Sequence, residues 1–260
     1  TACAQNSRAG HRLGYSLMKF KQAAALLDKI PHISRHSAQI LYDFLLSEKP
    51  KDCLELGFAH GASSGYIAAA LDELGAGTLT SVDLAGSADF EPTIETTLER
   101  LGLNSRVKIK REVNSYNWFL KKQIETQTED GVCKPCYDFI FIDGAKNWTI
   151  DGLAFFLSDK LLRPGGWILF DDYSWRYADA MARGKTRSDG VTNRELSDDQ
   201  IAEANIAAVF NLLVAQHPAY DELKVQDNSW AWAHKISGTT SAGASRVHHE
   251  RKSLLRSRLK

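Results

Sequence analysis

From Cys53 to Ser63 the chain reads CLELGFAHGAS. The first four residues form a short apolar run interrupted only by Glu55, which is typical of a buried β-strand. Gly57 and Gly61 follow, and glycine lets the backbone turn sharply and approach a ligand closely. Residues 63–74 then place apolar side chains on one helical face, and Gly75 just beyond them is the residue type that most often ends a helix. The stretch predicts a strand, a glycine-rich turn and a helix.

The same alternation continues along the chain. Further strands are predicted at 78–83, 106–113, 139–142 and 167–170, with helices at 94–101, 116–125, 150–162 and 201–216 between or after them. The runs 139–142 and 167–170 are apolar throughout, as expected for central parallel strands buried on both faces. Residues 224–226 and 230–235 look like a closing antiparallel hairpin. We therefore predict an α/β, doubly wound, Rossmann-like fold with a seven-stranded sheet, a C-terminal antiparallel hairpin and N-terminal helices.

Three parts of the chain are distinguished by pattern. Residues 1–48 are predicted as an N-terminal helical cap, because 16–48 is helical in pattern and is divided by Pro31. Residues 49–237 are predicted as the main domain. Residues 238–260 are rich in Ser, Gly and Thr and then basic, which is typical of a flexible tail. Within the main domain, 174–198 is a long polar segment, and the pattern is consistent with either a lid or a solvated loop.

Composition limits the classes of function. The 260 residues are 43% hydrophobic and 25% charged, and 32 basic side chains balance 32 acidic ones. The zero net charge argues against a nucleic-acid-binding protein, which usually carries a basic excess. No apolar run approaches the roughly 18 residues of a membrane span. The four cysteines suit a reduced, cytoplasmic protein, with Cys133 and Cys136 interpreted as structural.

In a doubly wound sheet, ligands bind beyond the carboxyl ends of the strands. The turn after the first strand matches neither the dinucleotide pattern G-x-G-x-x-G nor the phosphate-loop pattern. What remains is Glu-x-Gly-x-x-x-Gly, with Glu55 two residues before Gly57. Asp83 ends the second strand, where an acid accepts hydrogen bonds from both ribose hydroxyls of a nucleoside. The pattern favours a nucleoside-containing ligand.

Carboxylates also follow the two central strands. Asp143 and Lys146 come directly after the run 139–142, and Asp171 and Asp172 come directly after 167–170. Three converging carboxylates repel one another unless a cation lies between them, and oxygen ligands favour Mg²⁺. The alternative is that Asp171 and Asp172 cap a turn and only one of them faces the pocket. The residues alone leave both interpretations open.

Taken together, these motifs resemble those of the class I S-adenosylmethionine (SAM)-dependent methyltransferases over roughly residues 35–236. The stretch 55–61 resembles the first SAM-binding motif, Asp83 matches the ribose-binding acid, and 138–146 and 162–172 resemble the motifs of the fourth and fifth strands. The resemblance implies SAM as the cofactor, bound by Glu55, Gly57, Phe58, Gly61, Ser63, Asp83, Asn114, Ser115 and Asp143.

Within that superfamily the motifs are most similar to metal-dependent O-methyltransferases of the catechol and caffeoyl-CoA type. Asp143 and Lys146 match the Asp-x-x-Lys of that group, and Asp171 matches the acid of its Asp-Asn pair. Asp172 replaces the usual Asn, a departure that resembles the macrolide-sugar O-methyltransferases and puts the substrate in doubt more than the metal. The resemblance implies Mg²⁺ held by Asp143, Asp171 and Asp172.

The implied reaction is methyl transfer to a hydroxyl of a small phenolic or sugar acceptor in natural product biosynthesis. Asp143 and Lys146 are the expected catalytic residues, and Lys146, beside the cation, is expected to have a lowered pKa and to act as base. Helices before the first strand often form dimer contacts in this family, so a homodimer is an expectation.

Three alternatives compete with this prediction. A nucleic-acid methyltransferase that acts on base amino groups carries an Asn/Asp-Pro-Pro-aromatic motif where this chain has Asp143-Gly144-Ala145-Lys146. A non-catalytic SAM-binding partner subunit would not need the intact carboxylate trio. A dinucleotide-dependent oxidoreductase is disfavoured by the missing glycine pattern.

Overall fold

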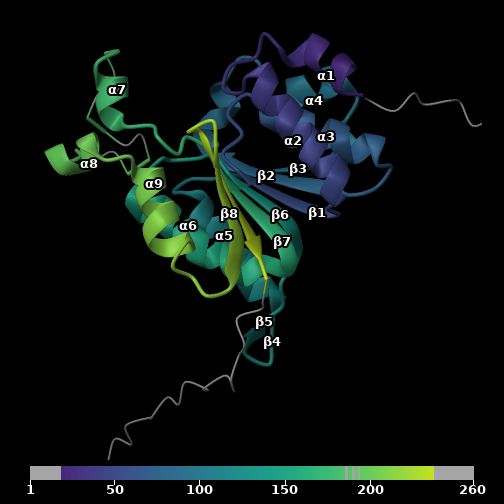
Figure 1. Ribbon diagram of the computed structural model, residues 1–260. Coiled ribbons are helices and arrows are strands. Elements are labelled where there is room, and N and C mark those ends of the chain that lie inside the picture. Colours follow the sequence, from purple (N-terminus) through teal and green to yellow (C-terminus); the bar gives the residue numbers. More distant parts are fainter. Residues whose placement is uncertain (1–18, 185–186, 189–190, 193, 237–260) are drawn as a thin grey trace, which may run out of the picture.

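A computed structural model describes residues 19–184, 187–188, 191–192 and 194–236. The expected tail at 238–260 and the first 18 residues lie outside the described residues. Seven strands form one sheet in the order β3-β2-β1-β6-β7-β9-β8 (Figure 1). In chain order, the strands of this sheet are β1 Asp52–Leu56, β2 Thr78–Leu84, β3 Val107–Glu112, β6 Tyr137–Ile142, β7 Leu162–Phe170, β8 Tyr220–Gln226 and β9 Trp230–Lys235.

The predicted topology is confirmed. Strands β3, β2, β1, β6 and β7 run parallel, and β9 and β8 close the sheet in antiparallel pairing. The chain crosses from β3 back to the middle of the sheet, so strand order reverses between β1 and β6. In doubly wound sheets such a reversal opens a crevice beyond the carboxyl ends of the strands, and that is where ligands bind.

Helices cover both faces of the sheet (Figure 1). One face packs against α1 Phe20–Leu27, α2 Arg35–Glu48, α3 Ala62–Glu73 and α4 Ile94–Leu101. The other packs against α5 Tyr116–Gln127, α6 Trp148–Leu161 and α9 Asn205–Val209, which continues as a π-helical turn, Phe210–Val214. Successive side chains of a strand point to opposite faces, so Phe139 and Phe141 join the first core whereas Ile140 and Ile142 join the second.

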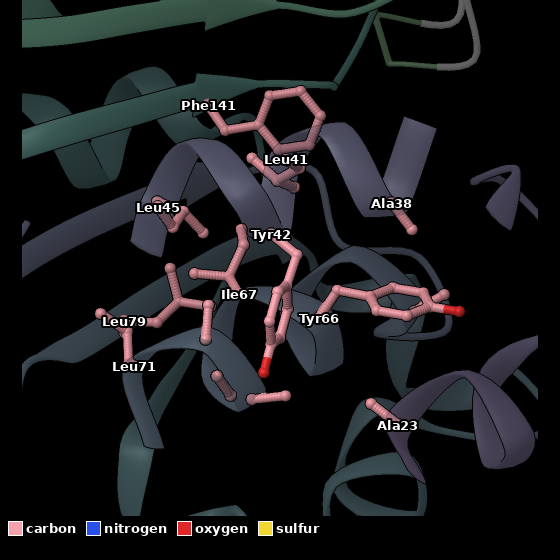
Figure 2. Close-up of a cluster of buried hydrophobic side chains, with 14 of the residues drawn as sticks. Ala23, Ala38, Leu41, Tyr42, Leu45, Tyr66, Ile67, Leu71, Leu79 and Phe141 are labelled. Carbon is pink, nitrogen blue, oxygen red and sulfur yellow. The ribbon is translucent and has the colours of Figure 1, made fainter. Parts of the chain in front are cut away.

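The N-terminal helices share the first core with the sheet. Figure 2 shows Leu41, Tyr42 and Leu45 of α2 stacked against Ile67 and Leu71 of α3, with Phe141 of β6 and Leu79 of β2 in the same cluster. The Tyr42 hydroxyl leaves this apolar cluster to donate to a Glu73 carboxylate oxygen, 2.5 Å away. No helix in the described part of the chain is long and apolar enough to cross a bilayer.

One predicted helix is broken. In place of a single helix over 201–216, the structure has α8 Asp198–Ala202 and then α9, separated at residues 203–204. The Asn205 side-chain amide donates to the carbonyls of Gln200 and Glu203, and its oxygen accepts from the Trp148 N–H of α6. An asparagine that bonds nearby backbone in this way competes with helical hydrogen bonding, which explains the break. The segment 174–198 also contains a short helix, α7 Tyr177–Met181.

Short elements that the sequence pattern did not indicate complete the fold. The strands β4 Thr128–Glu129 and β5 Val132–Cys133 form a small hairpin after α5. Two 3₁₀ turns, Ala85–Asp89 and Asn104–Arg106, flank α4. These elements are too short to produce a periodic signal in the sequence.

Candidate active site

The glycine-rich turn between β1 and α3 sits directly against the end of β6. Gly57 has φ +96°, and a Cβ built there would lie 2.2 Å from the Asp143 carbonyl oxygen. The Gly57 N–H donates to the Val82 carbonyl at 2.7 Å, which ties the turn to β2. Gly61, at φ +81°, is the N-cap residue of α3 and leaves no room for a side chain against Ile94. Both positions require glycine, as the sharp turn predicted from the sequence does, and in the structure each lies close to another segment of the protein.

This close approach gives a first prediction. In Gly57→Ala, the new methyl group must displace the backbone of residue 143, so we expect binding of SAM to weaken by at least about tenfold. Thermal stability should fall as well, by about 1–3 kcal/mol. Calorimetric titration with S-adenosylhomocysteine (SAH) and thermal unfolding measure the two effects.

Gly75→Ala is the matched control. Gly75 also has a positive φ, +70°, but nothing lies within 4 Å of a Cβ built there. This variant should lose stability through backbone strain alone and bind SAH normally. Equal SAH affinity in both variants would show that the contact between Gly57 and residue 143 has no role in cofactor binding.

Asp83 holds the glycine turn in place. One of its carboxylate oxygens accepts from the N–H groups of Phe58 and Ala59, each at 2.8 Å, and the other accepts from the Leu84 N–H at 2.6 Å. Asp83 also lines the cavity described next. Its position at the end of β2 is as the sequence predicts, and its binding to three backbone N–H groups is a structural role that the sequence did not indicate.

A cavity of about 270 Å³ lies beyond the ends of β1, β2 and β6; we call it the cofactor cavity. Among the residues expected to bind SAM, six line it: Gly57, Phe58, Ser63, Asp83, Ser115 and Asp143. Sequence reasoning missed other lining residues: Pro31, His32, Ala59, Ala62, Leu84, Phe90, Tyr116, Gly144, Ala145 and Val191. Most of these are direct chain neighbours of predicted residues, so wider windows around each motif would have found them.

Three of the expected SAM-binding residues lie elsewhere. Gly61 is not among the lining residues and begins α3. Asn114 is exposed, whereas its neighbour Ser115 lines the cavity and caps α5 by accepting from the Asn117 N–H. Glu55 is fully buried behind the glycine turn.

Glu55 belongs to a buried polar cluster. One carboxylate oxygen accepts from the hydroxyls of Ser64 and Ser81, and the other has no hydrogen-bond partner among the described residues. Burial raises the pKa of Glu55 to about 7, although the serine hydroxyls partly counteract it. The ionised form is therefore disfavoured in the folded protein.

The raised pKa of Glu55 makes stability depend on pH. Its pKa in the folded protein, about 7, lies above the ordinary value of 4.5. The contribution of protonated Glu55 to the free energy of unfolding is therefore complete below about pH 4.5 and is lost as the pH rises through 7. Glu55→Gln cannot ionise. We expect almost no gain in the variant at pH 4 and a gain of up to about 3 kcal/mol at pH 8.

Chemical unfolding of the variant and the parent across this range measures the difference. Buried Asp143 and Asp171 also titrate, so only the difference between the two proteins isolates Glu55. Glu99→Gln, an exposed change on α4, should give a flat difference. A flat difference for Glu55→Gln as well would contradict the prediction.

The three predicted metal ligands converge. Asp143 follows β6, and Asp171 and Asp172 follow β7, with one carboxylate oxygen of each lying within 4.8 Å of the others. The ladder between the strands extends to these residues, because the Asp143 N–H donates to Leu56 and the Asp171 N–H to Ile142. Asp171 and Asp172 both contribute an oxygen to this cluster, although only Asp172 of the two lines a cavity and the Asp171 carboxylate also accepts from the Asp172 N–H. We call Asp143, Asp171 and Asp172 the carboxylate trio.

The electrostatics of the trio reflect crowding of like charges. Burial, together with the negative charge of Asp171, raises the pKa of Asp143 well above its usual range. Burial and the charge of Asp172 raise the pKa of Asp171 to about 6. The trio offers only oxygen donors on partly buried side chains, and this donor set suits a hard divalent cation such as Mg²⁺. These residues therefore fit the cation that the sequence implies.

Lys146 lies against the trio. Its Nζ is 2.8 Å from an Asp172 oxygen and 3.4 Å from an Asp143 oxygen. Burial by itself lowers the pKa of the ammonium group, but Asp143 and Asp172 outweigh it and raise the pKa above the ordinary value. The sequence analysis expected a lowered pKa for Lys146, and this is wrong when only the protein's own residues surround it. The expectation assumed a cation beside Lys146.

A second cavity of about 480 Å³ is lined by Asp172 of the trio; we call it the outer cavity. Its lining residues are Asp172, Ser174, Trp175, Asp179, Ala182, Arg183 and Ser229. The cofactor cavity touches the trio through Asp143 and the outer cavity touches it through Asp172. Trp175 lines this cavity, and its ring packs edge-on against the ring of Tyr177.

Comparison with known proteins gives a family match over part of the chain. Residues 54–173 match the family model described as a methyltransferase domain. A search of proteins of curated function gave no match to the chain.

Solved structures with the same fold include three O-methyltransferases. One is TomG of Streptomyces achromogenes, involved in tomaymycin synthesis and solved with SAM, at 19% identity and TM-score 0.54 over 85% of this chain and 89% of that one. An enzyme of Bacillus cereus in complex with SAH shares 20% identity at TM-score 0.55 over 83% and 87%. A putative caffeoyl-CoA O-methyltransferase of Staphylococcus aureus shares 18% at 0.55 over 85% and 93%. At these identities the likeness establishes the fold.

Proposed function

We propose that this chain, whose residues 54–173 match the model of a methyltransferase domain, is a class I SAM-dependent methyltransferase that methylates a hydroxyl group of a small molecule at a Mg²⁺ site. One observation carries the proposal: the carboxylate trio contributes a lining residue to each of two cavities, Asp143 to one and Asp172 to the other. This arrangement suits a cofactor on one side, an acceptor on the other, and a cation where they meet.

The cofactor cavity has the parts that SAM requires. SAM supplies an electrophilic methyl group when bound. Asp83 would accept hydrogen bonds from the ribose, and the glycine turn would approach the methionine part closely. Ser115, at the start of α5, is in a position to contact the adenine. We assign Glu55 and Gly61 to holding the turn from behind.

A cation held by Asp143, Asp171 and Asp172 would lower the pKa of the acceptor hydroxyl and fix its direction. The chain's own contribution is alignment, because a methyl transfer requires the attacking oxygen to stand behind the methyl carbon. The charge of that cation would offset the carboxylates and lower the pKa of Lys146, which leaves the amine neutral. We assign the neutral Lys146 Nζ as the group that would receive the hydroxyl proton, since it lines the cofactor cavity and contacts Asp172.

The outer cavity favours a small acceptor. It is bordered by one aromatic ring, that of Trp175, and by polar groups, including Arg183 and Asp179. That mixture suits a phenolic or sugar hydroxyl in a natural product, as the Asp171-Asp172 pair also suggests. Cys53, Cys133 and Cys136 are free thiols, which suits a reducing compartment such as the cytoplasm.

The test is transfer of labelled methyl from SAM into a panel of catechols, deoxysugar glycosides and hydroxycinnamoyl thioesters, with and without a chelator. We expect transfer that the chelator abolishes and Mg²⁺ restores. Transfer that is indifferent to the chelator would remove the cation from the proposal, leaving Lys146 as the positive partner of Asp143 and Asp172. Transfer into DNA or RNA in place of the panel would contradict the small-molecule assignment.

A further inference from the structure

Two buried side chains hold the turn that carries Asp143 and Lys146. Tyr116 is the first residue of α5 and is 5% exposed, and Asp151 lies in the first turn of α6 and is 0% exposed. The Tyr116 hydroxyl donates to one Asp151 carboxylate oxygen and accepts from the Ala145 N–H at 3.2 Å. The other Asp151 oxygen accepts from the Asn147 N–H at 2.7 Å. One buried pair thus binds the backbone on both sides of Lys146.

The same tyrosine faces the cofactor cavity. Tyr116 is among the residues that line it, together with Gly144 and Ala145 of the turn. A Cβ built on Gly144 would lie 2.2 Å from Cε1 of the Tyr116 ring, so ring and backbone are in close contact. Tyr116 therefore touches the cavity with its ring and the turn with its hydroxyl.

The turn needs such support because its backbone is unusual. Lys146 has φ +56°, a left-handed conformation that non-glycine residues adopt at a cost. A residue keeps such a conformation only where its surroundings hold it there. From the opposite side, the Tyr177 hydroxyl of α7 donates to the Ala145 carbonyl at 2.8 Å. The placement of Lys146 against the trio thus depends on contacts made by its neighbours.

We propose that Tyr116 and Asp151 are positioning residues that couple occupancy of the cofactor cavity to the placement of Asp143 and Lys146. Cofactor in the cavity presses on the Tyr116 ring and fixes its hydroxyl, and the hydroxyl fixes the turn. Binding of cofactor then tightens binding of a divalent cation at the trio, and by linkage the cation tightens binding of cofactor equally. This inference rests on the proposed function, whose cofactor and cation it takes as ligands.

The experiment measures coupling without turnover. Mn²⁺ is titrated calorimetrically into the full chain with and without saturating SAH. In the parent protein, SAH should raise Mn²⁺ affinity by about tenfold or more. Tyr116→Phe keeps the ring and removes only the hydroxyl, so SAH should bind within about twofold of the parent while the enhancement falls below about twofold. Asp151→Asn, which keeps the shape of the side chain, should also reduce the enhancement.

Tyr220→Phe is the matched control. The Tyr220 hydroxyl donates to buried Asp159 at 3.0 Å, in a pairing similar to that of Tyr116 with Asp151. Tyr220 pairs with Lys235 at the end of β9. This end lies beside the start of β7, whereas the trio follows the other end of β7. This variant should lose stability as Tyr116→Phe does and keep the coupling. Full coupling in Tyr116→Phe, or its loss in both variants, overturns the inference.

A second readout separates this inference from the proposed function. If Mn²⁺ does not bind the parent protein, the cation part of the proposed function fails. Amide hydrogen exchange then decides the inference without a metal. SAH should slow exchange at residues 144–147 in the parent and in Tyr220→Phe but not in Tyr116→Phe. Equal slowing in all three proteins overturns the inference.

Discussion

Replacing Asp143 with asparagine is expected to reduce the rate of methyl transfer by about a thousandfold. Asp143 lines the cofactor cavity and also belongs to the carboxylate trio. The amide removes one negative charge and presents N–H donors toward the place where the cation is proposed to sit. A cation contributes several kcal/mol to such a reaction, and each 1.4 kcal/mol changes a rate about tenfold. Initial rates at saturating SAM, with Mg²⁺ varied, measure the loss.

Asp138→Asn provides the control on the same strand. Asp138 is the second residue of β6, and it pairs with Arg163 at 2.6 Å and accepts from the N–H groups of Lys51 and Asp52. Its pKa is lowered: burial would raise it, but the two backbone hydrogen bonds and the Arg163 contacts outweigh burial. This variant should unfold more easily and keep its rate. A rate for Asp143→Asn within about threefold of the parent would remove Asp143 from the reaction.

The location of the trio follows from the sequence because each carboxylate comes directly after an apolar run. The runs 139–142 and 167–170 are strands β6 and β7, and their parallel pairing in register brings Ile142 beside Phe170. The next residues, Asp143 and Asp171, must therefore emerge at the same edge. Periodicity predicts that edge, whereas the order of the strands in the sheet is known only from the structure.

The sequence pattern did not predict contacts between segments that are distant in the chain. Tyr116 and Asp151 meet across 35 residues, and nothing in either helix indicates the pairing. Glu55 has the same spacing to Gly57 whether it faces a ligand or the core, so only the structure places it under α3. The pKa of Lys146 depends on two oxygens at 2.8 and 3.4 Å, and its direction changes with the charge that stands beside it.

Replacing Lys146 with methionine is expected to lower kcat by roughly 10²–10⁴-fold, the range that removal of a positioned proton-transfer group produces. The side chain lines the cofactor cavity and contacts two members of the trio. Methionine keeps much of its length but removes the amine, which carries the charge when protonated and is proposed to accept the proton when neutral. Rates at saturating SAM and Mg²⁺ measure the effect. Lys122→Met, which removes a surface lysine paired with Glu112, should leave kcat unchanged.

Lys146→Arg distinguishes the two roles of this side chain. Arginine keeps the positive charge but does not release its proton at accessible pH. If Lys146 receives the proton of the acceptor hydroxyl, the arginine variant should lose as much kcat as the methionine variant while its Mn²⁺ affinity stays closer to the parent. If Lys146 serves only as the partner of Asp143 and Asp172, arginine should restore most of kcat. That second result would leave the trio and its cation as the site of activation and would require another group to take the proton.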